Sequence, residues 1–109
     1  MRSRASALAV LFTVMAAGCG GSQTGSQTNP RELMRGKQVF TERCGNCHAL
    51  KDAGTRGGIG PDLDTAKPDA GTVRTKVTNG SGAMPPFRGQ LSQADIRAVA
   101  QYVSEKADR

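Results

Sequence analysis

The chain has 109 residues, 37% of them hydrophobic, and a formal net charge of +6 at neutral pH, which is the size of one small domain. Its Lys and Arg residues are scattered singly, with no basic run interleaved with aromatic residues, so the composition argues against nucleic-acid binding. Only three Phe, one Tyr and no Trp are present. That is thin for a domain of this size, and it favours a bound apolar group that completes the core.

The N-terminus has the pattern of an export signal. Arg2 and Arg4 precede an apolar and small-residue run over residues 5–17, which is too short to span a bilayer as a helix. The Ala-Gly pair before Cys19 is similar to the bacterial lipobox, in which the cysteine is acylated and becomes the new N-terminus. We expect residues 1–18 to be a lipoprotein signal peptide. The alternatives for Cys19 are a stray thiol in an ordinary signal or a link to another chain.

A flexible linker is expected over residues 19–29, where Gly-Ser-Gln-Thr repeats offer nothing apolar to bury. The folded domain should then cover residues 30–109. Its first helix is expected to start at Asn29 as the N-cap, with Pro30 in the first turn and Glu32 placed to close a capping box. Several positions share one face of this helix, and they are Leu33, Gly36, Lys37, Phe40 and Cys44.

Immediately after this helix the chain reads Cys44-Gly45-Asn46-Cys47-His48, which is the attachment signature of a c-type haem. Two sulfurs on one turn can add to the two vinyl groups of a haem, and the adjacent histidine is then held under the iron. A redox-active dithiol would need a strand before the motif, and a zinc site would need about four ligands. A disulfide between Cys44 and Cys47 would close a very small loop and contribute little.

The rest of the chain predicts an all-α domain. Residues 49–68 are rich in Gly and Pro and predict a loop. A short helix is expected over residues 70–78, stopped by Asn79 and Gly80. A second loop carries Met84, and a last helix is capped by Ser92, with an apolar stripe at Ile96, Val99, Ala100 and Val103.

With these motifs identified, the chain resembles the class I cytochromes c, especially the small lipid-anchored ones of bacteria. The resemblance covers about residues 31–105. It implies three main helices with loops wrapped around one haem, and a contact between the first and last helices at Gly36, Phe40 and Tyr102. It also implies that the Pro61 carbonyl accepts a hydrogen bond from His48, and that Met84 is the distal iron ligand opposite His48.

Independent of the resemblance, Met84 lies far enough beyond His48 to reach the other haem face, and Pro85 restricts its backbone. The alternative is an ordinary buried methionine beside an open iron. With cofactor-binding residues Cys44, Cys47, His48, Pro61 and Met84, and with His48 and Met84 on the metal, the expected function is electron transfer rather than catalysis.

We therefore expect a monomer with one haem c, anchored outside the cytoplasm by lipid on Cys19 and exchanging electrons with membrane-bound redox proteins such as an oxidase or dehydrogenase. Two alternatives remain open at this point. One is an open-site haem protein with peroxidase-like or gas-binding activity. The other is a fixed electron-transfer subunit of a larger oxidoreductase.

Overall fold

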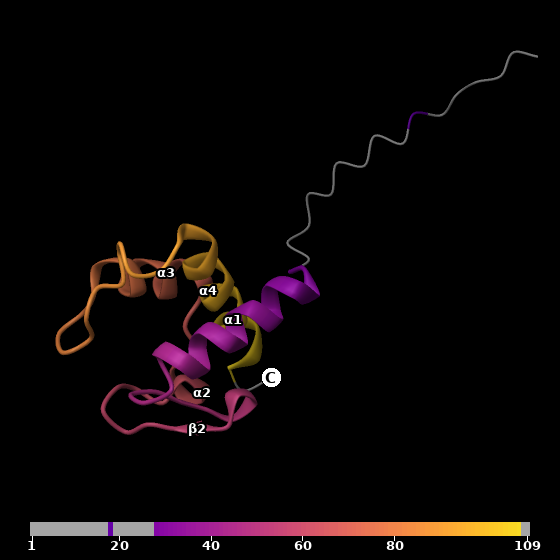
Figure 1. Cartoon of the computed structure of the whole chain (residues 1–109). Coiled ribbons are helices and arrows are strands. Elements are labelled where there is room, and N and C mark those ends of the chain that lie inside the picture. Colours follow the sequence, from indigo (N-terminus) through magenta and orange to yellow (C-terminus); the bar gives the residue numbers. More distant parts are fainter. Residues whose placement is uncertain (1–17, 19–27, 108–109) are drawn as a thin grey trace, which may run out of the picture.

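The computed structural model describes residue 18 and residues 28–107. The expected signal except for its last residue, Cys19 and nearly all of the linker lie outside the described residues. Within the described part, the chain is mainly helical (Figure 1), so the all-α class is confirmed. Its α-helices are α1 (Pro30–Arg43), α2 (Leu63–Ala66), α3 (Ala70–Asn79) and α4 (Gln93–Lys106). No helix in this part is both long and apolar enough to cross a membrane.

Helix α1 begins as predicted. The side chain of Asn29 accepts a hydrogen bond from the backbone N–H of Arg31 at 2.9 Å, and Pro30 occupies the first turn. The Glu32 carboxylate bonds to Arg97 of α4 at 3.3 Å. Glu32 thus helps to join α1 to α4, whereas the sequence predicted a capping box.

The two long helices, α1 and α4, cross in direct contact (Figure 1). At the crossing, a Cβ atom on Gly36 would lie 2.2 Å from the carbonyl oxygen of Ala98 and 2.5 Å from the Cβ of Tyr102. Only glycine permits this approach. Next to it, the rings of Phe40 and Tyr102 are 6.0 Å apart at 56°, and each residue is 1% exposed. The expected helix contact is confirmed.

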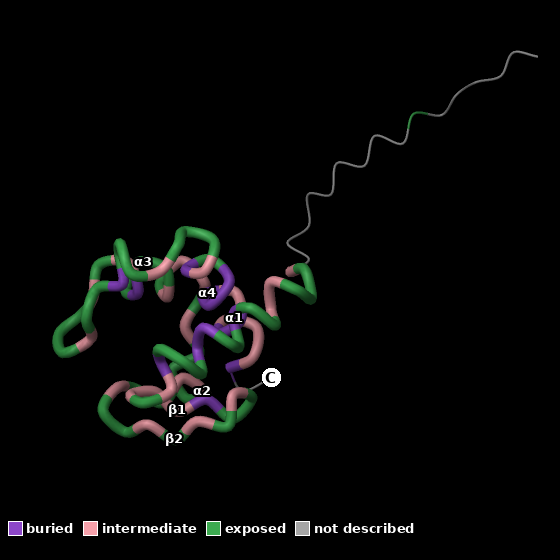
Figure 2. Tube along the Cα trace, viewed as in Figure 1, coloured by how far each residue is buried: buried purple, intermediate pink, exposed green. Residues whose placement is uncertain are grey.

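Helix α3 packs against α4 and carries the second part of the core. Val77 of α3, Phe87 of the following loop and Ile96 of α4 form a buried cluster. Figure 2 shows the buried segments concentrated where α1, α3 and α4 face one another. Both helices start at polar caps. Ser92, the predicted cap of α4, accepts from the N–H of Asp95, and Asp69, which was not among the predicted caps, accepts from the N–H of Thr72.

Residues 49–68 are more regular than the predicted loop. Ala49–Leu50 (β1) and Thr55–Arg56 (β2) pair antiparallel around a 3-10 turn, Lys51–Ala53 (η1). Farther along, Asp62 caps the single turn of α2, which ends at Lys67 in a left-handed conformation with φ of 45°. The loop prediction is therefore wrong at these points, although the segment still connects the haem signature to α3.

Candidate functional site

The two motif cysteines lie on a tight turn at the end of α1. Cys44 is the C-cap residue, and its carbonyl accepts hydrogen bonds from the N–H groups of Cys47 at 3.0 Å and His48 at 2.9 Å. This turn keeps both sulfurs and the imidazole within one short segment. The turn follows a helix, whereas a thioredoxin-like dithiol would follow a strand.

Burial raises the pKa of the Cys44 thiol to about 11, with a smaller contribution from the nearby Cys47. A thiol with a raised pKa stays protonated at neutral pH and is a poor nucleophile for disulfide exchange. The environment of Cys44 thus disfavours the dithiol interpretation. Cys44 and Cys47 are not bonded to each other, so this motif contains no disulfide in the structure.

His48 is held by the segment that begins at Gly60. Its Nδ1 lies 2.8 Å from the carbonyl oxygen of Pro61. Because a carbonyl only accepts, Nδ1 carries the proton, and the lone pair is left on Nε2. A Cβ on Gly60 would lie 2.5 Å from Cε1 of this ring. The absence of a side chain at Gly60 therefore lets the backbone press against the imidazole.

Thr55 supports the same turn, a role that no motif in the sequence indicated. Its hydroxyl donates to the carbonyl of His48 at 2.9 Å and accepts from the N–H of Leu50 at 3.1 Å. A Cβ on Gly45 would lie 2.5 Å from the Thr55 methyl group. Thr55 thus connects β2 to the haem signature. Only a prediction of the short hairpin could have placed it there.

Met84 is presented by a loop between α3 and α4 that is closed by backbone hydrogen bonds. The N–H of Ser81 donates to the carbonyl of Met84 at 3.0 Å, and the N–H of Met84 donates to that of Ser81 at 2.9 Å. Gly80, with φ of 76°, begins the loop where a Cβ would lie 2.7 Å from the Met84 carbonyl. The N–H of Phe87 returns to the Val77 carbonyl at 2.8 Å. The loop is therefore fixed at both ends.

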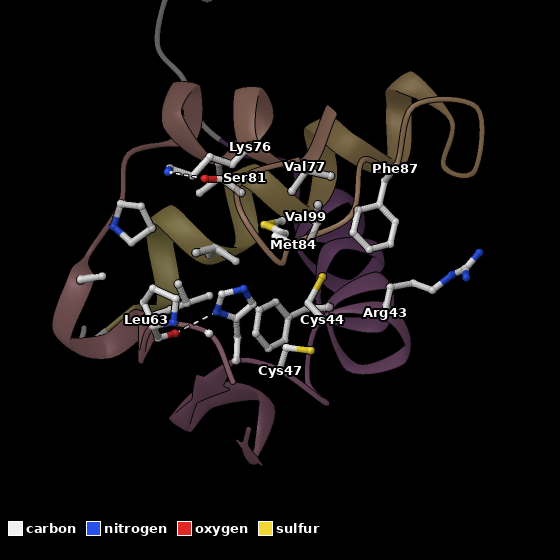
Figure 3. Close-up of a pocket in the computed structure, with 18 of the residues that line it drawn as sticks. Arg43, Cys44, Cys47, Leu63, Lys76, Val77, Ser81, Met84, Phe87 and Val99 are labelled. Atoms are coloured by element: carbon white, nitrogen blue, oxygen red, sulfur yellow. Dashed lines mark hydrogen bonds between the residues drawn. The ribbon is translucent and has the colours of Figure 1, made fainter. Parts of the chain in front are cut away.

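These elements surround one cavity of about 360 Å³. Cys44, Cys47, His48, Pro61 and Met84 all line it, so the structure brings the five predicted site residues together. In Figure 3, the two cysteines lie on one side of the cavity and Met84 lies across from Cys47. Most of the remaining lining is apolar, which suits a flat apolar group. The two thiols suit covalent attachment of a haem, and imidazole and thioether are groups that bind the iron in cytochromes c.

Four of the scattered cations, Lys37, Lys51, Arg56 and Arg88, do not line the cavity. Lys37 lies 3.5 Å from Asp52, and Arg88 donates to Asn79 at 2.7 Å.

Arg43 and Lys76 line the cavity instead. The sequence could have indicated Lys76, because this residue directly precedes Val77, which lies on the inner side of α3.

The model of the family "Cytochrome C oxidase, cbb3-type, subunit III" matches residues 31–103. Cytochrome c6 of Picosynechococcus sp. is 36% identical over 94% of this chain and 91% of its own. Cytochrome c6 of Leptolyngbya boryana is 40% identical over 68% of this chain and 92% of its own length. The crystal structure of the c-type cytochrome SorU from Sinorhizobium meliloti is similar, with a TM-score of 0.71 and 45% identity, over 74% of this chain and 97% of that one.

These likenesses cover the folded part of the chain, and they agree with the arrangement of α1, α4 and the cavity. They confirm the class I cytochrome c fold and the single covalent cofactor. The chain belongs to the class I c-type cytochromes, and it is an electron carrier with haem c bound covalently through Cys44 and Cys47.

Proposed function

We propose that the protein carries single electrons on an iron held between His48 and Met84. The observation that carries this proposal is that both side chains line one cavity with the two motif cysteines, although they come from separate segments of the chain. When bound, the haem supplies a one-electron redox centre whose potential depends on its axial ligands. The protein supplies the ligands, their orientation and the apolar surroundings.

His48 would act as the proximal ligand through Nε2. Its Nδ1–H donates to the Pro61 carbonyl at 2.8 Å, and such a bond fixes both the tautomer and the ring orientation of a metal ligand. The bond also makes the ligating nitrogen more basic. In this proposal, Pro61 positions the ligand without touching the iron.

Met84 would act as the distal ligand through its sulfur. A neutral thioether opposite histidine raises the reduction potential. With both axial positions taken, the iron has no open site for peroxide, oxygen or an organic substrate, which supports electron transfer rather than catalysis. The hydrogen-bonded loop around Met84 would hold the sulfur in place in both oxidation states.

A pair of methionine substitutions tests this ligation. The oxidised wild type should show the weak far-red absorption band of a sulfur–iron bond, and Met84→Leu should lose it and gain affinity for imidazole or cyanide. Met34→Leu is the matched control, because Met34 lies on α1 and is 74% exposed. A wild type that lacks the band and binds these ligands readily would instead support the open-site alternative.

We further propose that residues 1–18 are removed, that Cys19 is acylated, and that residues 19–29 tether the domain outside the cytoplasm. The support is the sequence pattern together with the place where the chain enters the domain. Thr28 bonds to Glu105 beside the start of α1, whereas Arg43 and Cys44 at the other end of α1 line the cavity. A helix of 14 residues is about 20 Å long, so a tether there would leave the haem region free.

Such a tether would keep the monomer close to membrane-bound redox proteins such as an oxidase or dehydrogenase, since tethering raises the local concentration of the partners. Mass spectrometry of the mature protein tests the anchor. We expect one haem and the mass of acyl groups on Cys19, while Cys19→Ser should keep the haem and lose the acyl mass. A mature N-terminus elsewhere, without lipid, would remove the anchor but leave the electron carrier intact.

The family match favours a second candidate, because its description names a subunit of an oxidase. In that case the protein would be a fixed electron-transfer subunit. Purification from detergent-solubilised membranes distinguishes the two. A shuttle should separate from its partners at moderate salt, whereas a fixed subunit should stay in a complex of constant stoichiometry.

A further inference from the structure

The side chains that line the cavity include positively charged residues and no negatively charged ones. Two basic side chains, Arg43 and Lys76, are part of the lining, and no Asp or Glu is. A haem brings two propionate carboxylates into an otherwise apolar site. Buried or half-buried carboxylates need cationic or hydrogen-bonding partners. The lining thus contains candidates for these partners.

The covalent attachment decides which of the two cations can meet a propionate. The thioether bonds form at the vinyl groups, and the propionates occupy the two pyrroles on the opposite edge of the porphyrin. Arg43 is adjacent to Cys44 in the chain and lies at the thioether side. Lys76 and Ser81 lie at the other end of the cavity, well away from Cys44 and Cys47 (Figure 3). A haem attached at Cys44 and Cys47 would therefore direct its carboxylate edge toward the side of the cavity that carries Lys76.

Lys76 is also held in this position. It is on α3, and its Nζ lies 3.4 Å from Oγ of Ser81, as the dashed line in Figure 3 marks. Ser81 is fixed in turn by its two backbone hydrogen bonds to Met84. An ammonium and a hydroxyl are thus placed side by side on the wall, where both can donate to one carboxylate.

We propose that the Nζ of Lys76 forms an ion pair with a haem propionate, with the hydroxyl of Ser81 as a second donor. This inference rests on the haem site given under Proposed function, and within it on the thioether attachment rather than on Met84. It has a consequence for electron transfer. Ferric haem carries one more positive charge than ferrous haem, so a cation held against the cofactor favours the reduced form. Lys76 accordingly raises the reduction potential.

The test compares Lys76→Gln, Lys76→Arg and Ser81→Ala with Arg74→Gln in the intact holoprotein. Arg74→Gln is the matched control, because it removes one positive charge from the same helix at a residue outside the cavity lining. We expect Lys76→Gln to lower the midpoint potential more than Arg74→Gln does. Lys76→Arg should restore most of the loss, and Ser81→Ala should lower the potential less than Lys76→Gln.

The pH dependence of the potential separates an ion pair from a distant field effect. Oxidation favours the ionised propionate, so the potential falls with rising pH over the range in which the propionate titrates. Lys76 keeps that range at acid pH, and Lys76→Gln should move it toward neutrality, as Arg74→Gln should not. The other ionisable groups of the lining do not compete, because Arg43 stays protonated and Cys44, Cys47 and His48 are bound to the haem or its iron.

Equal changes of potential in Lys76→Gln and Arg74→Gln would overturn the inference. So would a larger change in Lys76→Gln with no movement of the pH range. The far-red band of the wild type is recorded first and tests Met84 separately. Loss of that band would refute the His/Met electron carrier, while the comparison of Lys76 and Arg74 would still report on the propionate.

Discussion

Gly60→Ala should displace the imidazole of His48, the proposed proximal ligand. The new Cβ would lie 2.5 Å from Cε1 and 2.8 Å from Nδ1 of the His48 ring, so the ring or the backbone must move by roughly 1 Å to reach an ordinary van der Waals contact. Overpacking of this kind costs about 1–3 kcal/mol. The movement also strains the bond between His48 and the Pro61 carbonyl, which is worth about 0.5–1.5 kcal/mol.

The assay is thermal unfolding of the holoprotein, followed by absorbance and combined with redox titration. A loss of about 2 kcal/mol corresponds to a fall of roughly 8–16 °C in the melting temperature of a domain this small. The potential should rise, because a weaker bond at Nδ1 makes the ligating nitrogen less basic. Gly58→Ala is the control in the same segment, since a Cβ there meets nothing within 4 Å. If both variants have the same melting temperature and the same reduction potential, the contact of Gly60 with His48 does not hold the imidazole in position.

Substitutions at three further positions test the scaffold around the site. Gly36→Ala should destabilise the protein by about 1–3 kcal/mol in denaturant titration, because its Cβ would overlap the backbone of α4, and an unchanged midpoint would contradict that crossing. Tyr102→Phe removes the hydroxyl that donates to Asp52 at 2.6 Å and should cost about 1.5 kcal/mol. That bond is the main cause of the lowered pKa of Asp52. The difference in free energy of unfolding between Tyr102→Phe and the wild type should therefore be largest at neutral pH and shrink as the pH falls and Asp52 becomes protonated. A difference that does not change with pH would be inconsistent with this origin. Thr55→Val should cost about 1–3 kcal/mol and Thr55→Ser much less, because only the valine lacks a hydroxyl for the carbonyl of His48, and calorimetry that ranks the two in the reverse order would exclude this role.

The long helices could be predicted from the sequence because their signals are local. Asn29 and Ser92 mark helix starts through hydrogen bonds that span two or three residues, and the apolar stripe of α4 repeats over several turns. Gly80 ends α3 with a positive φ, as Asn79-Gly80 suggested. These features depend on neighbouring residues alone, so a reading of the chain can find them.

The segment between the haem signature and α3 could not be predicted as well. Each strand of its hairpin is two residues long, which is too short for an alternating pattern. Helix α2 is a single turn that depends on Asp62 as its cap. Asp64 at its start also accepts from the N–H of Lys51 at 2.8 Å. Tertiary contacts of this kind stabilise elements that their own sequence does not specify.

The residues of the site also fall into two groups, those that a local motif predicts and those that depend on the tertiary structure. Cys44, Cys47 and His48 follow from a spacing that has a chemical reason. The role predicted for Pro61 came from the family resemblance, and the role predicted for Met84 came from the resemblance and from its position in the chain. Thr55 reaches the haem signature through the short hairpin, and Lys76 reaches the cavity from α3. Their roles depend on where β2 and α3 fall relative to the cavity, and the sequence predicted β2 as loop.

The two sides of the cavity are stabilised by different means. On the proximal side, His48 is confined by the Pro61 carbonyl and the backbone at Gly60, and its own carbonyl is tied to Thr55. On the distal side, Met84 depends on a short loop anchored to α3. Ligands held by such rigid surroundings need little rearrangement when the iron changes charge. The hydrogen bonds on the distal side hold the backbone of Met84, whereas the one to Pro61 holds the His48 ring itself. If Met84 is the distal ligand, as proposed, it should therefore leave the iron before His48 does when the protein is stressed.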